Sequence, residues 1–224
     1  MTLSREDWGP PMDIELLPAV VHDYLDGLVP PRPAEMQAME AYAAETRFPI
    51  IGPAAGYLCY QIARMIGARR VFELGSGFGY STAWFARAVQ ENGGQVVHHV
   101  VWDEALSQRA RGHLSRLGFG GLIQFQVAEA VAALRKTAGP FDLIFNDIDK
   151  QGYPASLPVI AEKLRPGGVL IVDNLLWHGR IFDKSDQSDD TRGVRELTRL
   201  LTRDSRWIAS IVPIRDGVMV AIKK

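Results

Sequence analysis

The sequence predicts an α/β protein whose mostly parallel β-sheet carries helices on both faces and ends in an antiparallel hairpin. From Arg69 onward, short apolar segments alternate with helical ones, which is the pattern of βαβ units. Near the end of the chain, two apolar segments follow each other directly and are joined by Arg215-Asp-Gly217, a hairpin turn signal. Before residue 68 the chain has few strand signals and is expected to be helical.

These patterns predict where the elements lie. In the helical first region, Pro33 is placed to open one helix, and Pro53 precedes another over Ala54–Ile66. The apolar face of a later helix is marked, at helical spacing, by Leu106, Ala110, Leu114 and Leu117. We expect strands at Arg70–Leu74, Gln95–Trp102, Leu122–Val127, Phe141–Asp147, Gly168–Asp173, Trp207–Ile214 and Val218–Lys223.

Length and composition predict a single globular domain. The 224 residues suffice for one well-packed domain, and 47% of them are hydrophobic and 23% charged, close to globular averages. We therefore treat 1–224 as one domain, with an N-terminal helical region, 1–67, and a core, 68–224.

Charge, hydropathy and cysteine content argue against several classes of protein. Lysine plus arginine total 25 against 26 aspartate plus glutamate, a net charge of −1, so a basic excess for general nucleic-acid or membrane binding is lacking. The apolar runs are too short to span a bilayer, and Met1–Trp8 carries acids early instead of the apolar stretch of a signal peptide. Cys59 is the only cysteine, so no internal disulfide can form. We expect a soluble protein of the reducing cytoplasm.

A glycine-rich loop follows the first predicted strand of the core. Gly75, Gly77 and Gly79 allow the backbone to turn sharply and to approach a ligand closely. The spacing is G-x-G-x-G instead of the G-x-G-x-x-G of dinucleotide-binding loops, and a carboxylate, Glu73, precedes it. Both features disfavour a pyrophosphate and suit a cofactor with an amino group, such as S-adenosylmethionine. The alternative for Glu73 is a strand-end charge paired with a nearby arginine.

Acidic and amide side chains end two later strands of the predicted sheet. Asp147 ends one of these strands, and Asp173 and Asn174 end the next. If the strands are parallel neighbours, their oxygens meet at one edge and suit a hard cation: Mg²⁺, Mn²⁺ or Ca²⁺. Lys150 lies beside this cluster and could act as a base or stabilise an oxyanion. The alternative is that these residues cap helices or turns.

Five motifs are spread over most of the chain: Phe72-Glu-Leu-Gly-Ser-Gly-Phe-Gly-Tyr-Ser81, Phe141-Asp-Leu-Ile-Phe-Asn-Asp-Ile-Asp-Lys150, Leu164-Arg-Pro-Gly-Gly168, Val172-Asp-Asn-Leu-Leu-Trp-His-Gly179 and Pro213-Ile-Arg-Asp-Gly217. In these motifs the sequence resembles the small, cation-dependent O-methyltransferases that act on catechols and caffeoyl-coenzyme A. The resemblance runs over nearly the whole chain. The resemblance implies a Rossmann-like, seven-stranded sheet, a homodimer, and N-terminal helices near the substrate.

The resemblance also implies roles for individual residues. The cation ligands would be Asp147, Asp173 and Asn174, and Lys150 would be the catalytic lysine, beside Asp147. Contacts to S-adenosylmethionine would come from the loop, from the strand ends and from the adenine pocket: Glu73, Gly75, Ser76, Gly77, Ser81, Ala130, Asp147 and Asp149.

Two positions depart from the family pattern. Val101 stands where the family usually has an acid that binds the ribose. We expect Asp103 to replace this acid and Trp102 to cover the adenine. The alternative is that Asp103 only caps the following helix and that Trp102 is a core residue. In the substrate region, His178 stands where the family often has asparagine. The polar loop 183–190 that follows is expected to be mobile and without chemistry.

Together these observations predict cation-dependent methyl transfer from S-adenosylmethionine to a hydroxyl of a small catechol-type or hydroxycinnamoyl aromatic. One alternative keeps the chemistry but methylates a hydroxylated tRNA base, which the balanced charge disfavours. Others are a non-catalytic cofactor-binding or scaffolding protein and a nicotinamide-dependent dehydrogenase, the latter disfavoured by the glycine spacing.

Overall fold

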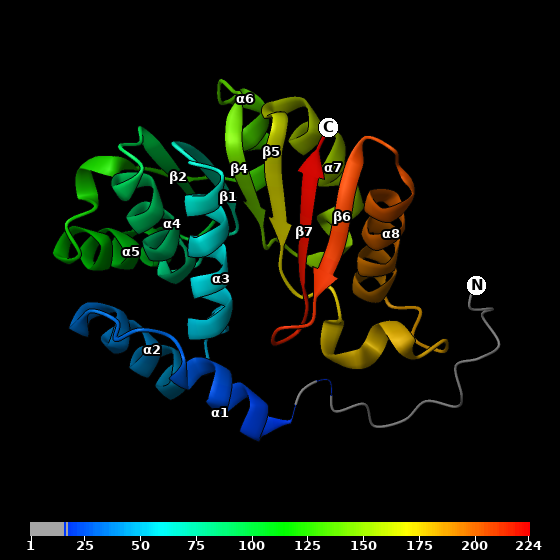
Figure 1. Ribbon diagram of the computed structural model, residues 1–224, viewed down its shortest axis with the longest axis horizontal. Helices are drawn as coiled ribbons and strands as arrows, with labels where there is room; N and C mark the ends of the chain where they lie inside the picture. Colours follow the sequence, from blue (N-terminus) through cyan, green and yellow to red (C-terminus); the bar gives the residue numbers. More distant parts are fainter. Residues whose placement is uncertain (1–15, 17) are drawn as a thin grey trace.

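The computed structural model describes residues 16 and 18–224, so Met1–Trp8, on which the signal-peptide argument rests, lies outside the described residues. One seven-stranded sheet has the order β3-β2-β1-β4-β5-β7-β6 (Figure 1). The strands are β1 (Arg70–Leu74), β2 (Val96–Val101), β3 (Ile123–Val127), β4 (Phe141–Asn146), β5 (Leu164–Val172), β6 (Trp207–Val212) and β7 (Val218–Lys223). The first five pair in parallel, and β7 pairs antiparallel with β5 and β6. The predicted fold class is confirmed.

Helices cover both faces of the sheet. The α-helices are α1 (Ala19–Gly27), α2 (Ala34–Thr46), α3 (Gly52–Met65), α4 (Tyr80–Glu91), α5 (Glu104–Arg116), α6 (Ala130–Lys136), α7 (Tyr153–Lys163) and α8 (Asp189–Arg203). Short 3₁₀ segments are η1 (Gly120–Leu122), η2 (Lys150–Gly152) and η3 (Trp177–Phe182).

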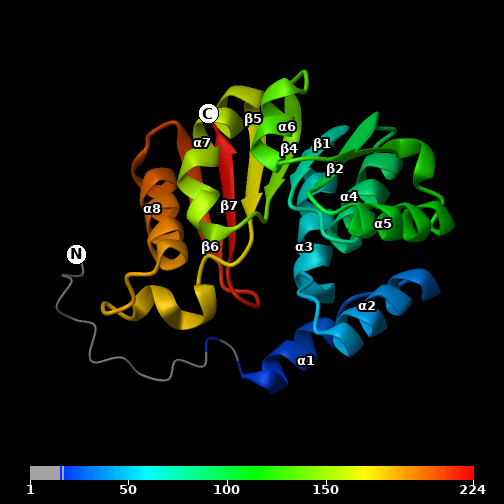
Figure 2. The same cartoon turned by 180° about the vertical axis from the view of Figure 1, so that it is seen from behind.

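Two apolar clusters fill the space between sheet and helices. Because side chains alternate along a strand, Val71 joins the cluster under α3, α4 and α5, whereas Phe72 joins the one under α6, α7 and α8. Seen from behind, α6 and α7 lie over the second face (Figure 2). In the part of the chain that the structure describes, no helix is long and apolar enough to cross a membrane.

The N-terminal helices lie on the side of the molecule toward which β4 and β5 point (Figure 1). Asp26 of α1 accepts a hydrogen bond from the Ala54 backbone nitrogen at the start of α3, at 3.0 Å. The ring of Phe48 lies where a side chain at Gly77 would contact it at 3.2 Å. This region therefore borders the glycine-rich loop at the carboxyl edge of the sheet.

Candidate active site

The carboxyl ends of β4 and β5 bring the predicted acidic residues together. Asn146 and Val172 are register partners, so the residues that follow them, Asp147 and Asp173, emerge side by side. The backbone nitrogen of Asp147 donates to the Leu74 carbonyl of β1 at 2.9 Å. Three neighbouring strands therefore fix the edge on which both carboxylates stand, as the sequence predicts.

Both carboxylates are held in an environment that disfavours their charge. Burial raises the pKa of Asp147, and burial together with the neighbouring Asp147 carboxylate raises the pKa of Asp173 to about 7. The side chain of Asp173 is only 4% exposed. Two cations oppose this effect: Lys150 Nζ lies 2.8 Å from Asp147 Oδ1, and Arg215 Nη1 lies 3.8 Å from Asp173 Oδ2.

Asn174 is oriented by Asp216, in the turn between β6 and β7. The Asn174 Nδ2 donates to Asp216 Oδ2 at 3.2 Å, and the His178 backbone nitrogen donates to Asp216 Oδ1 at 2.5 Å. Because an ionised carboxylate only accepts hydrogen bonds, Asp216 turns the amide nitrogen of Asn174 toward itself and presents the amide oxygen elsewhere. The backbone of Asn174 is left-handed, with φ 61°.

The donor set of Asp147, Asp173 and Asn174 fits a hard divalent cation. The neighbouring carboxylates of Asp147, which is half-buried, and Asp173, which is buried, repel each other, and a cation between them would remove that repulsion. Residues 16 and 18–224 contain no group of three or more histidine, cysteine, aspartate or glutamate side chains placed to hold a metal ion. The set proposed here consists of two carboxylates and an amide.

Lys150 is enclosed by aromatic rings. Its Nζ lies 5.1 Å from the centroid of the Tyr153 ring and 5.8 Å from that of Trp177. The Tyr153 hydroxyl in turn donates to the Asp173 carbonyl at 2.9 Å. These contacts and the bond to Asp147 hold the ammonium group beside the two carboxylates.

The glycine-rich loop packs against the end of β4. A Cβ atom at Gly75, whose φ is 85°, would lie 2.4 Å from the Asp147 carbonyl oxygen, so only glycine permits this approach. The hydroxyl of Ser76 accepts a hydrogen bond from the Val100 backbone nitrogen at 2.9 Å and thereby ties the loop to β2. The backbone is thus close enough to the strand end to border a ligand there.

Glu73 is fully buried and bonded to helix α4. Ser81 donates to one carboxylate oxygen, and Thr82 donates to the other at 2.5 Å. Burial raises the pKa of Glu73 to about 7, although these hydroxyl groups lower it. The alternative of an arginine partner is wrong in the described part of the chain. Ser81, another predicted cofactor contact, is therefore the partner of Glu73.

At the end of β2, the structure bears on the alternatives for Trp102 and Asp103. Trp102 is 83% exposed, so the alternative that it belongs to the core is wrong. Asp103 accepts a hydrogen bond from the Leu106 backbone nitrogen at 2.8 Å, which confirms that it caps α5. Ala130 begins α6, and Asp149 is exposed just before η2.

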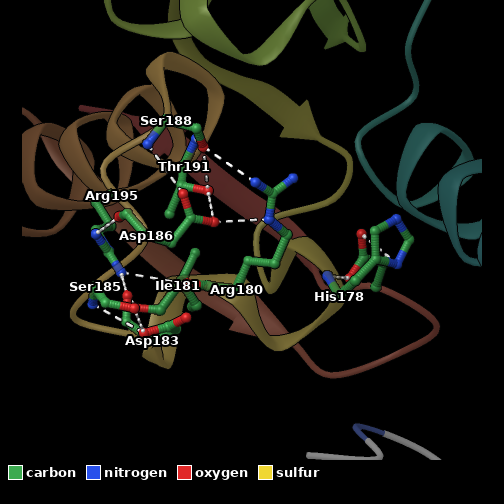
Figure 3. A network of polar contacts seen from close by, with 10 residues as sticks. His178, Arg180, Ile181, Asp183, Ser185, Asp186, Ser188, Thr191 and Arg195 are labelled. Atoms are coloured by element: carbon green, nitrogen blue, oxygen red, sulfur yellow. Dashed lines mark hydrogen bonds and ion pairs between the residues drawn. The ribbon is translucent and has the colours of Figure 1, made fainter. Parts of the chain in front are cut away.

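The polar loop after β5 is held by a network of hydrogen bonds (Figure 3). Asp186 accepts from Arg180 Nε at 2.7 Å and from Thr191 Oγ1 at 2.8 Å. Arg195 of α8 donates to the Ile181 carbonyl at 3.0 Å and to other carbonyls of the loop. The His178 side chain is 72% exposed, and its Nδ1 lies 3.7 Å from Asp216 Oδ2. The sequence analysis expects a mobile loop and did not anticipate this network.

Sequence reasoning missed two charged residues beside the site, Arg215 and Asp216. It used Arg215-Asp-Gly217 as a hairpin turn signal and as part of a motif of the resemblance, and it assigned neither charged residue to the site. No local signal could have found them, because this turn meets Asp173 only in the folded structure.

Comparison with known proteins gives the same family along most of the chain. The O-methyltransferase family model matches residues 36–224. A catechol O-methyltransferase of Mycobacterium tuberculosis is 35% identical over 190 residues, which cover 83% of this chain and 85% of that protein. A catechol O-methyltransferase of Niastella koreensis is 28% identical over 224 residues, covering 95% and 100%.

The fold agrees with that match. The crystal structure of the O-methyltransferase TomG of Streptomyces achromogenes, involved in tomaymycin synthesis and solved in complex with S-adenosylmethionine, superposes with a TM-score of 0.82. It is 25% identical, and the superposition covers 100% of both chains. With the family model matching more than four fifths of its length, this protein belongs to the O-methyltransferase family.

Proposed function

We propose that the protein transfers the methyl group of S-adenosylmethionine to one hydroxyl of a small aromatic compound with vicinal hydroxyls, aided by a divalent cation. The observation that carries this proposal is the pair of carboxylates, half-buried Asp147 and buried Asp173, at neighbouring strand ends beside Asn174. The catechol O-methyltransferases among the relatives support a catechol-type acceptor, and the complex of TomG supports the cofactor.

Asp147, Asp173 and Asn174 would hold the cation, with Mg²⁺ preferred and Mn²⁺ or Ca²⁺ as substitutes. When bound, such a cation lowers the pKa of a coordinated hydroxyl group. Asp216 keeps the oxygen of the Asn174 amide directed away from itself, which prepares the third ligand.

Lys150 accepts or steers the proton of the acceptor hydroxyl. Its hydrogen bond to Asp147 fixes Nζ next to the proposed cation ligands, where the hydroxyl must lose its proton. The rings of Tyr153 and Trp177 limit the access of water to the same atom. His178 borders this space as a substrate contact.

The cofactor site lies on the other half of the edge, around the glycine-rich loop. The close approach of Gly75 to the end of β4 supports this placement. The exposed ring of Trp102 is available to cover the adenine, and Asp103 to bind the ribose. The remaining proposed contacts are Glu73, Ser76, Gly77, Ser81, Ala130, Asp147 and Asp149.

We also propose a homodimer that uses helix α1. Val20 and Tyr24 of α1 and Leu28, directly after its end, lie four residues apart and are 72%, 66% and 62% exposed. An apolar stripe of this kind is typical of an interface. Light scattering at micromolar concentration is expected to give twice the chain mass, and a monomer mass would refute the dimer.

A methylation assay tests the proposed function. Catechol, hydroxycinnamoyl thioesters and bulk tRNA are incubated with S-adenosylmethionine, with Mg²⁺ or with excess chelator. We expect methylation of the vicinal diols, loss of turnover in chelator, and recovery on addition of Mg²⁺. Full activity in excess chelator, or methylation of tRNA alone, would overturn the proposal.

A further inference from the structure

Arg215 occupies a backbone position that is unfavourable for a residue with a side chain. Its φ is 50°, in the left-handed region, and the next residue but one, Gly217, has φ 81°. Such strain at a non-glycine residue persists where the surroundings enforce it, and it is concentrated at functional sites. A glycine at position 215 would form the same turn without strain. We therefore expect the side chain of Arg215 to have a role that offsets this strain.

The guanidinium group of Arg215 is placed beside the proposed acceptor site. The side chain passes Gly52 at the start of α3, where an added Cβ would lie 3.4 Å from Arg215 Cδ. It ends 3.8 Å from Asp173 Oδ2, beyond hydrogen-bond distance, and is 30% exposed. No hydrogen bond joins this guanidinium to another residue of the described part of the chain. Its fork of donors is thus available to a ligand.

The charges around Arg215 indicate what that ligand carries. Lys150 and Arg215 balance Asp147 and Asp173, and Asp216, next to Arg215 in the turn, adds one negative charge. A divalent cation and the sulfonium of S-adenosylmethionine would add three positive charges, and a catechol that has lost one proton returns one negative charge, so that one positive charge remains. The guanidinium would then face a surplus of positive charge, which an anionic group on the acceptor would reduce.

We propose that Arg215 is a specificity-determining residue that binds a carboxylate carried by the acceptor, so that the preferred acceptors are aromatic acids with vicinal hydroxyls. The planar fork of arginine matches a carboxylate with two parallel hydrogen bonds. This inference rests on the proposed function, and it narrows the acceptor class.

The test compares two acceptors of nearly equal shape, 3,4-dihydroxybenzoate and 3,4-dihydroxybenzamide, at saturating S-adenosylmethionine and Mg²⁺. In the wild type, kcat/KM for the acid is expected to exceed that for the amide roughly tenfold or more, the value of one charge-assisted hydrogen bond. Arg215→Gly relieves the strained turn and is expected to bring this ratio close to one while the amide is still methylated.

Three further variants serve as comparisons and controls. Arg215→Lys retains the charge and is expected to retain part of the preference, and Arg215→Asn is a second neutral variant that tolerates the left-handed backbone. Arg192→Gln removes an exposed arginine of α8, paired with Asp189, and is expected to leave the ratio unchanged. Calorimetric binding of both compounds to protein loaded with Mg²⁺ and S-adenosylhomocysteine gives the same ratio without turnover.

The outcomes separate this inference from the proposed function. Equal methylation of acid and amide by the wild type, or an unchanged preference in Arg215→Gly, would overturn the role of Arg215 and leave cation-dependent methyl transfer intact. Failure of the protein both to bind and to methylate either compound would overturn the inference, and failure with catechols as well would count against the proposed function.

Discussion

Polar side chains are paired differently in the two halves of the sheet's carboxyl edge. In the half formed by β1 and β2, polar side chains are bonded within the fold: Ser76 to Val100, Asp103 to Leu106, and Glu73 to two hydroxyl groups. In the half formed by β4, β5 and the β6–β7 turn, like charges lie side by side and the backbone is strained. In the first half the polar groups are paired within the fold, whereas the second half combines such bonds, from Lys150 to Asp147 and from Asn174 to Asp216, with two neighbouring carboxylates of like charge.

This difference indicates which half of the sheet's carboxyl edge is arranged for catalysis. Asn174, Trp177, His178 and Arg215 all have positive φ, and they lie in the segment that follows β5 and in the β6–β7 turn. Repulsion and backbone strain reduce stability, and they are retained where a ligand or a reaction requires them. In the β1–β2 half, glycine instead allows the backbone to approach the end of β4, where we propose that the cofactor binds. The variants below test this contrast.

Removing one of the crowded carboxylates is expected to have the largest effect. Asp173→Asn keeps the shape but loses a cation ligand, and we expect a fall in turnover of about 10³ or more, because metal assistance is worth several kcal/mol. The same change removes a buried charge, so the melting temperature of the metal-free protein is expected to rise. Assays and thermal unfolding measure both; Asp189→Asn, at an exposed position, is the control. A fall in both quantities would show that Asp173 is mainly structural.

Lys150→Ala is expected to lower turnover by a factor on the order of 10² and to leave the affinity for S-adenosylmethionine unchanged. The reason is that Nζ contacts the proposed cation ligands instead of the glycine-rich loop. Lys150→Arg retains the charge but cannot accept a proton, so full activity of that variant would limit the role of Lys150 to electrostatics. A large loss of cofactor affinity with normal turnover at saturation would contradict the assignment.

The buried acid of the β1–β2 half is expected to leave a pH signature in stability. Folding raises the pKa of Glu73 from 4.5 to about 7, so the folded protein holds this proton more tightly than the unfolded chain. The wild type therefore loses stability as pH rises from about 4.5 to about 7, by on the order of 3 kcal/mol for this group. Glu73→Gln lacks this loss, and its stability relative to the wild type in urea unfolding is expected to be greater at pH 8 than at pH 5. Equal differences at the two pH values would show that Glu73 is ionised throughout.

Asp103→Ala is expected to have the smallest effect. It tests whether Asp103, which caps α5, also binds the cofactor. Loss of the cap on α5 is expected to cost about 1 kcal/mol of stability. If Asp103 also binds the ribose, calorimetry will show about tenfold weaker binding of S-adenosylmethionine. Ser188→Ala removes the corresponding cap of α8 and is expected to lower stability alone. Unchanged cofactor affinity in Asp103→Ala would leave Asp103 with only its capping role.

The same contrast explains what the sequence could predict. The alternation of strands and helices determines the sheet, and parallel strands bring their carboxyl ends to one edge, so Asp147, Asp173 and Asn174 could be placed together from pattern alone. Strand β5 begins at Leu164, four residues before the predicted Gly168, because an irregularity in its pairing with β4 accommodates the Pro166-Gly-Gly168 segment inside the strand.

Side-chain partners could not be predicted in the same way. The bonds of Glu73 to Ser81 and Thr82 depend on the angle between β1 and α4, and the exposure of Trp102 depends on where α5 begins. The approach of Arg215 to Asp173 joins segments that are far apart in the sequence. The β6–β7 turn does not itself require an arginine at this position, so the turn pattern does not predict the contact. Local periodicity carries no information about such contacts.

The central claim is that the β4–β5 half holds a divalent cation, and Mn²⁺ binding followed by electron paramagnetic resonance tests it most directly. Mn²⁺ is titrated into metal-free wild type, Asp173→Asn and Asp189→Asn. We predict one bound Mn²⁺ per chain in the wild type and in Asp189→Asn, displaced by excess Mg²⁺, and none in Asp173→Asn. A wild type that binds no Mn²⁺, or an Asp173→Asn variant that binds it as tightly as the wild type, would contradict the account.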